Sequence, residues 1–213
     1  MKRYALFLAG LIIPAISTFA QTIKLPEPQK TGGKPLMEVL SQRQSTRDFD
    51  TSRTLSDQTL SNLLWAGFGY NREGKRTAPS AMNRQEIAIY IITSQSTFIY
   101  DASLNELKEI TKGDYRKAAG SQDFVYTAPV NLVFVCDKTK MPNIQMAYAD
   151  CGFIAQNIYL YCASECLGTV VRGSFDKNEL SRILKLNENQ EILLCQTIGL
   201  SLIHISEPTR QAE

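Results

Sequence analysis

"QMAYADCGFIAQNIYLYCASECLG", residues 145–168, is the stretch of sequence that decides the fold. Its apolar side chains recur at helical spacing, which predicts one long helix ending at Gly168, a suitable residue just beyond a helix C-terminus. One face of this helix carries Met146, Ala149, Phe153, Gln156, Asn157 and Leu160. Close packing against a second helix is favoured by the small residues Ala147, Ala149, Gly152 and Ala155.

Short apolar runs on both sides of this helix predict a sheet. Strands are expected at 86–93, 129–137 and 191–199, with a strand-like turn at 169–175 and a hairpin at 96–110. Further helices are expected at 35–44, 56–71, 114–128 and 176–186, with Ser56 and Asp176 as N-caps, and residues 72–85 are expected to form a loop. This order predicts the α+β class, with a mixed central sheet flanked by helices. No G-x-G-x-x-G motif follows the first strand, so a dinucleotide-binding fold has no support.

Composition narrows the classes of function. The chain has 213 residues and a formal net charge of +2, which gives no electrostatic case for a nucleic-acid partner. Its five cysteines are odd in number and scattered, so they predict neither a disulfide framework nor a metal site. Beyond the N-terminus, no apolar run is long enough to span a membrane.

The two ends of the chain differ from the rest. Residues 1–20 begin with Lys2 and Arg3, continue with an apolar run and end on small residues, the pattern of a signal peptide cut after Ala20. A membrane anchor is the alternative, but Pro14 interrupts the run, so we expect an exported, periplasmic protein. Residues 21–34 predict an extended leader, and 35–199 the folded domain. Residues 200–213 contain "LSLIHISEPTR", which matches a translated sequencing adapter, and we expect this tail to be non-native.

The loop "QRQSTRDF", residues 42–49, is a candidate anion site. Arg43 and Arg47 lie four residues apart, with the Ser45 and Thr46 hydroxyls between them. Arginine forks and hydroxyl donors suit a phosphate group. For two arginines alone, an exposed surface turn is the alternative interpretation.

Four stretches in order carry a resemblance to a known family: "RQSTRDF" (43–49), "RTAPSAMNRQEIAIYII" (76–92), residues 149–176 and "ILLCQTIG" (192–199). Together they resemble the nitroreductase superfamily of flavoproteins, over nearly all of 35–199. Within it, "LLWAGFGYNREGKRTAPSA" (63–81) and "IYDASLNELKEI" (99–110) are similar to the SagB-like branch, which includes azoline dehydrogenases.

The resemblance implies a homodimer with two FMN molecules at the subunit interface. It assigns the FMN phosphate and ribityl chain to Arg43, Ser45 and Arg47. It assigns the flavin ring to a loop of the partner subunit with Pro79, Ser80, Ala81 and Asn83, and Gln85 is a further candidate in this loop. A segment over the ring would contain Val170, Arg172 and Gly173; the Arg172 side chain would either face the ring or point to solvent.

These observations predict an exported FMN-dependent oxidoreductase that transfers hydride through flavin N5. Its small organic substrate and its redox partner are unknown, and no side chain is assigned as catalytic. The alternatives are an NAD(P)H-dependent nitro- or quinone reductase and a non-catalytic flavin-binding protein.

Overall fold

A computed structural model describes residues 21–202 as an α+β fold built on a seven-stranded sheet. The strands are β1 (Thr22–Lys24), β4 (Ile87–Ile92), β5 (Ser96–Asp101), β6 (Glu106–Lys112), β7 (Val130–Asp137), β8 (Leu167–Arg172) and β9 (Gln190–Leu200). They lie in the order β1-β6-β5-β4-β7-β9-β8. The α+β class is confirmed, but every pairing in this sheet is antiparallel, so the sheet is not mixed as expected.

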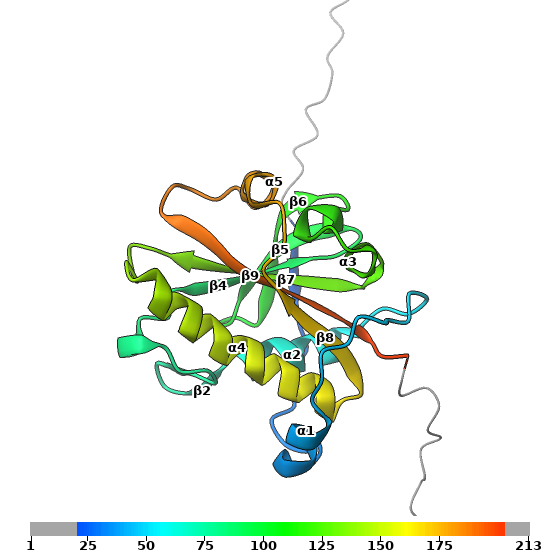
Figure 1. The fold of residues 1–213 in the computed structure, drawn as a ribbon. Coiled ribbons are helices and arrows are strands. Elements are labelled where there is room, and N and C mark those ends of the chain that lie inside the picture. The colour runs from blue at the N-terminus through cyan, green and yellow to red at the C-terminus, as the bar shows by residue number, and fades with distance from the viewer. Residues whose placement is uncertain (1–20, 203–213) are drawn as a thin grey trace, which may run out of the picture.

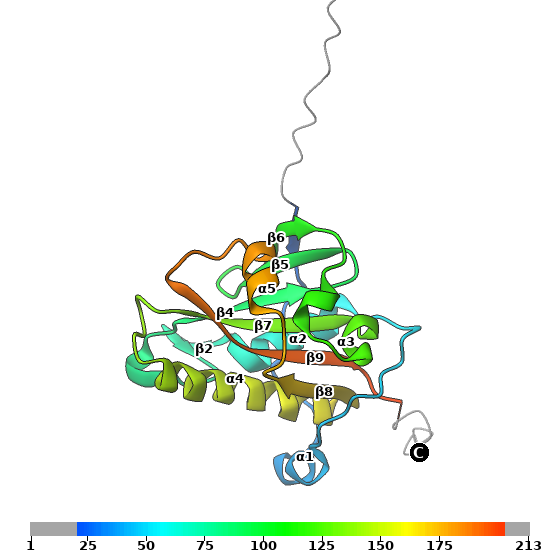
Figure 2. The same ribbon diagram turned by 45° about the horizontal axis from the view of Figure 1, so that its top comes forward.

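Helices cover both faces of the sheet (Figures 1 and 2). They are α1 (Leu36–Gln42), α2 (Asp57–Phe68), α3 (Asp123–Thr127), α4 (Ile144–Ser164) and α5 (Lys177–Ile183), with 3₁₀ turns η1 (Ala81–Asn83) and η2 (Arg116–Ala119). The long α4 runs beside α2 on one face, whereas α3 and α5 lie on the other. Because helices cover both faces of the sheet, successive residues of the central strands are apolar and do not alternate between apolar and polar.

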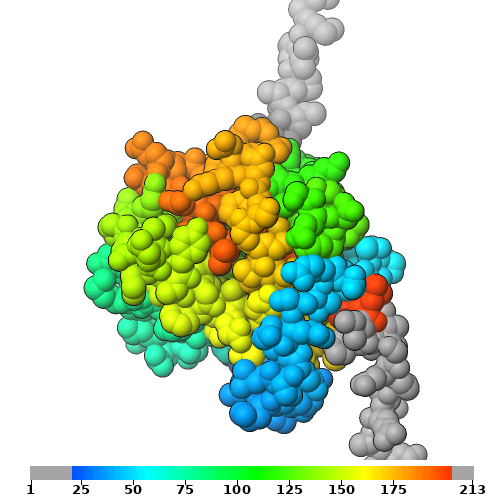
Figure 3. Space-filling view, in the orientation of Figure 1, coloured from blue at the N-terminus to red at the C-terminus, as the bar shows by residue number. Residues whose placement is uncertain are grey.

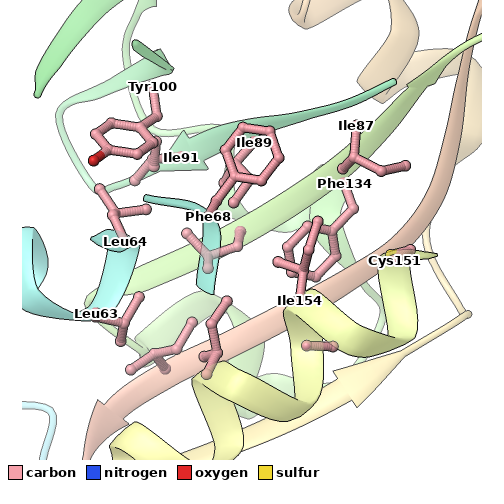
Figure 4. Packing of buried hydrophobic residues seen from close by; sticks show 14 of the residues in the cluster. Leu63, Leu64, Phe68, Ile87, Ile89, Ile91, Tyr100, Phe134, Cys151 and Ile154 are labelled. Atoms are coloured by element: carbon pink, nitrogen blue, oxygen red, sulfur yellow. The ribbon is translucent and has the colours of Figure 1, made fainter. Parts of the chain in front are cut away.

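The core divides between these two faces because successive strand residues point in opposite directions. Ile89 and Ile91 of β4 pack with α2 and α4, as Figure 4 shows, while Tyr90 and Ile92 pack on the face with α5. Helix α2 approaches α4 closely at Gly67, where an added Cβ would lie 2.8 Å from the Ile158 side chain. This contact holds α4, which carries much of the candidate site, firmly against α2.

Helix α4 ends earlier than the sequence predicted. It stops at Ser164, and the left-handed position beyond its end is taken by Cys166, with φ of 55°. Gly168 instead lies in β8 opposite Gly199, and the Phe49 ring packs across both glycines. An added Cβ on Gly168 or Gly199 would lie 3.0 or 2.8 Å from that ring, so the ring's close approach requires both glycines.

Other differences from the predicted elements are local. The leader contains β1, which pairs with β6, and Leu25 beyond it is buried. The predicted loop 72–85 includes part of a small hairpin, β2 (Tyr70–Arg72) and β3 (Lys75–Arg76). The helix expected at 114–128 is split at Gly120 into η2 and α3. Ser56 and Asp176 cap their helices as predicted, each accepting a backbone N–H.

The expected signal peptide and residues 203–213 of the expected tail lie outside the described residues. Strand β9 extends to Leu200, one residue past its predicted end, and Ser201 forms an isolated bridge with Phe49. All five cysteines are free thiols. Within residues 21–202, no helix has both the length and the apolar character needed to cross a membrane.

Candidate functional site

The arginine loop, residues 43–48, follows α1 and contacts the C-terminal half of α4 and strand β8. The Thr46 N–H donates to the Thr169 carbonyl of β8 at 2.9 Å, and Thr46 is buried. The Arg43 guanidinium lies over the Tyr159 ring, 5.3 Å from its centroid. Arg47 is exposed. Within the described part of the chain, neither guanidinium has a hydrogen-bond or carboxylate partner, so both remain free to bind an anion.

Tyr159 of α4 joins the arginine loop to the end of β8, and no sequence motif marks it. Its hydroxyl oxygen accepts the Val171 N–H at 2.9 Å and lies 3.0 Å from the Ser45 hydroxyl. One side chain therefore sets the position of Ser45, of Arg43 above its ring, and of the backbone of the 170–173 segment.

The Arg172 side chain lies in neither predicted direction. It is only 6% exposed, and its guanidinium donates to the Ala119 carbonyl, to Asn131 Oδ1 at 3.1 Å and to Thr197 Oγ1 at 2.8 Å. Burial lowers its pKa. Arg172 points into the core because the side chains of β8 alternate and this position faces the layer of η2 and α3. The prediction of a cation over the ring is therefore wrong.

The two neighbours of Arg172 in the predicted segment differ in exposure. Val170 is buried in the core, so its side chain contributes packing rather than an open surface. Gly173 is exposed, and an added Cβ there would meet no atom within 4 Å. Gly173 is therefore the position of this segment that leaves open space beside the end of β8.

The second predicted segment, residues 79–85, is a tightly wound loop at the other end of α4. Met82, Asn83 and Gln85 have φ values of 54°, 55° and 49°, in the left-handed region that side chains other than glycine rarely adopt. Each such residue costs on the order of 1 kcal/mol, and clusters of them are typical of ligand sites. The loop is held by the Ala81 N–H, which donates to Asp150 Oδ2 of α4 at 2.8 Å.

The amides predicted to face a flavin ring are partly used within this loop. Gln85 accepts the Arg76 Nε–H at 3.1 Å and donates to the Gly74 carbonyl at 2.8 Å. Its role here is to join the β2–β3 hairpin to the loop, which differs from a direct cofactor contact. Asn83 also donates to Gly74, at 3.1 Å, but it is exposed and lies at the wall of an open hollow.

This hollow, which we call the hairpin hollow, lies between the β2–β3 hairpin and the 79–83 loop. Its volume is about 380 Å³. It is lined by Arg72, Lys75, Arg76, Ala78, Pro79, Ser80, Met82 and Asn83. Pro79, Ser80 and Asn83 from the predicted site therefore come together at one open surface.

Two buried carboxyl groups lie beneath the 79–85 loop. Glu86 and Asp150 are each 2% exposed, and neither oxygen of Glu86 has a hydrogen-bond partner among the described residues. Burial raises the pKa of Glu86, and the neighbouring Asp150 raises it further. Glu86 therefore holds a proton more tightly than an exposed carboxyl, while Asp150 holds the loop. No sequence pattern marked Glu86.

The arginine loop and the 79–85 loop contact α4 near its opposite ends (Figure 1). The first meets Tyr159 and the second meets Asp150. At about 1.5 Å per residue, these contacts are separated by roughly 14 Å along the helix axis. The predicted site residues of one chain thus form two separate half-sites.

Comparisons with known proteins agree on one family. The model of the nitroreductase family matches residues 40–200. A candidate nitroreductase of Methanocaldococcus jannaschii is 29% identical over 189 residues, which cover 81% of this chain and 93% of the relative. The crystal structure of a candidate nitroreductase from Ralstonia eutropha is 41% identical with a TM-score of 0.80, covering 91% of this chain and 96% of that chain.

A more distant structure shares the fold. It is a candidate nitroreductase from Desulfovibrio desulfuricans, solved in complex with FMN, at 20% identity and a TM-score of 0.60. The match covers 85% of this chain and 94% of that chain. The family match over residues 40–200 includes both half-sites.

Proposed function

The chain belongs to the nitroreductase family, and on that premise we propose that it is an oxidoreductase that works with bound FMN. The observation that carries the proposal is the pair of half-sites at opposite ends of α4. One offers two free guanidiniums and a hydroxyl, the donor set that suits a phosphate. The other offers a strained loop beside an open hollow, which suits a flat ring.

Arg43, Ser45 and Arg47 would hold the FMN phosphate and the adjoining ribityl hydroxyls. The open space at Gly173 would admit the ring beside the end of β8. Pro79, Ser80, Ala81 and Asn83 of the partner subunit's copy of the loop would face the ring. When bound, FMN supplies hydride and electron transfer through its N5 atom. The role of these side chains is to bind and orient it.

This arrangement requires a homodimer, and the exposed apolar residues support one. Leu36, Met37 and Leu40 of α1 are 61%, 76% and 46% exposed, although they are large and apolar. Helix α1 projects beside the C-terminal end of α4 in Figure 3, where a second subunit would cover it. On α4, Phe153 is 48% exposed, and the adjacent Gly152 leaves space for close approach.

The finer assignments rest on the sequence. Export to the periplasm rests on residues 1–20, the SagB-like branch on the similarity at 63–81 and 99–110, and the non-native tail on the adapter match from residue 200. An exported enzyme has little access to the cytoplasmic nicotinamide pools. We therefore expect an organic substrate or a redox partner to be the electron donor, rather than NADH or NADPH.

The proposal is tested by reconstituting the purified protein with FMN and measuring bound flavin, mass in solution and turnover with an artificial acceptor. We expect about one FMN per subunit and a dimer. A protein that binds no flavin would contradict the proposal, and one that binds flavin without turnover would favour the non-catalytic alternative. Rapid, saturable reduction of bound flavin by NADH or NADPH would favour an ordinary nitro- or quinone reductase.

A further inference from the structure

The hairpin hollow has a strongly one-sided charge. Its lining includes three cations, Arg72, Lys75 and Arg76, and no carboxylate. None of these cations forms an ion pair within the described part of the chain. A hollow lined by one sign of charge raises the local concentration of ions of the opposite sign. Its volume of about 380 Å³ lies within the usual range for small-molecule sites.

The placement of two of these cations is unfavourable for the fold alone. Arg72 and Lys75 are cross-strand partners in the β2–β3 hairpin. Like charges directly opposite each other destabilise a pair of strands. Both side chains are exposed, so no packing in the core accounts for them. A bound anion would turn this repulsion into attraction.

The third cation, Arg76, is held in one position by contacts within the protein. The Arg76 guanidinium lies over the rings of Phe68 and Tyr70, 3.7 and 4.2 Å from their centroids. Its Nη1 donates to the Phe68 carbonyl at 2.9 Å, and its Nε donates to Gln85. Its Nη2 has no acceptor among residues 21–202. Stacking and two hydrogen bonds hold the group still, so it would bind a ligand oxygen with little further loss of side-chain freedom.

We propose that the hairpin hollow binds the anionic group, a carboxylate or phosphate, of the small organic molecule that exchanges electrons with the flavin. Arg76 donates from Nη2, while Arg72 and Lys75 supply attraction at the rim. The inference rests on the proposed function, because Pro79 and Ser80 on the same wall are the residues assigned to the ring. The protein selects substrates that carry a negative charge at one end.

The test compares two probes of nearly equal size, 4-nitrobenzoate and the neutral 4-nitrobenzamide, by calorimetric titration into the flavin-loaded full-length protein. Tighter binding of the benzoate, weakened by added sodium chloride, is expected. In the R72Q/K75Q double variant, the benzoate should bind roughly fivefold to tenfold more weakly, because each exposed charge contributes about twofold to threefold and the two losses multiply. Binding of the benzamide should change less than twofold.

A matched control replaces an exposed cation elsewhere, Lys112→Gln, and should bind both probes as the parent does. Arg76→Lys keeps the charge but loses the planar donor, and should weaken the benzoate selectively. Titration with NADPH and with NADH distinguishes the two candidate anionic groups, a phosphate and a carboxylate. A preference for NADPH that R72Q/K75Q removes would assign the site to a phosphate, whereas benzoate binding without that preference would assign it to a carboxylate.

Equal affinity for the two probes in the parent protein would overturn the proposal, as would equal weakening of both in the double variant. The flavin content of each sample is measured first. A protein without flavin would contradict the proposed function, while calorimetry with 4-nitrobenzoate would still report whether the hollow binds anions. The two failures are therefore distinguishable.

Discussion

Replacing Tyr159 with phenylalanine should separate the two contacts that fix the arginine loop. The ring would remain beneath Arg43, but the hydroxyl that accepts the Val171 N–H and bonds to Ser45 would be lost. Each hydrogen bond contributes about 0.5–1.5 kcal/mol, and Val171 is half-buried, so its N–H would be only partly rehydrated. We expect Tyr159→Phe to lower the free energy of unfolding by about 1–3 kcal/mol.

The same change should weaken FMN binding. Ser45 would lose its fixed position, and the end of β8 would lose its tie to α4, so ordering both on binding would cost about 1 kcal/mol, or roughly fivefold in affinity. Urea unfolding of the flavin-free protein and fluorescence titration with FMN measure the two effects.

The control for this prediction is Tyr126→Phe. It removes a hydroxyl without a hydrogen-bond partner among the described residues and keeps the ring contact with Lys117. It should change stability by less than about 0.5 kcal/mol. If the two variants behave alike, the link through Tyr159 does not exist as argued.

Three further changes probe other parts of the site. Arg47→Ala should weaken FMN binding tenfold or more, since a charge-assisted contact is worth about 1.5–3 kcal/mol. The control Arg182→Ala should leave the affinity for FMN, measured by fluorescence titration, unchanged. Burial raises the pKa of Glu86, so the stability that Glu86 contributes is present at low pH and is lost as the pH rises through its pKa in the folded protein. In urea unfolding at successive pH values, Glu86→Gln should therefore reduce the fall in the free energy of unfolding with rising pH. An unchanged pH dependence of the free energy of unfolding would contradict the assignment. Phe153→Glu should yield a monomer with weakened FMN binding by light scattering, and Asn178→Glu, an exposed control, should not.

The sequence predicted the strands and main helices well because their signals are local. Strand β4, for example, is apolar on both faces, as a strand between two helical layers must be. Ser56 caps α2 through contacts within one turn. The residues of the two half-sites were also predicted from short motifs, since each set lies within a few consecutive residues, and their roles in binding FMN stay predictions.

What the sequence could not predict depends on contacts between distant segments. Gly168 has the local pattern of a helix-ending glycine, but it pairs with Gly199 in the sheet, where the Phe49 ring, distant in the chain, packs against it. Tyr159 is one aromatic residue among several in an apolar helix, and only the fold brings it to Ser45. Strand β1 has just three residues, and only its pairing with β6 reveals it.

The arginines of this chain show why residue type alone does not assign a role. The guanidinium of Arg172 is surrounded by carbonyl, amide and hydroxyl oxygens of the protein, so its donors are already used and a ligand has nothing to gain from it. Arg43 has a ring beneath it but no acceptor among the described residues, and Arg76 has one free nitrogen. An arginine whose donors are satisfied within the protein stabilises the fold, whereas one that is held in place with free donors is prepared for a ligand. By this measure Arg43 and Arg76 mark two candidate anion sites near opposite ends of α4, and Arg172 marks none.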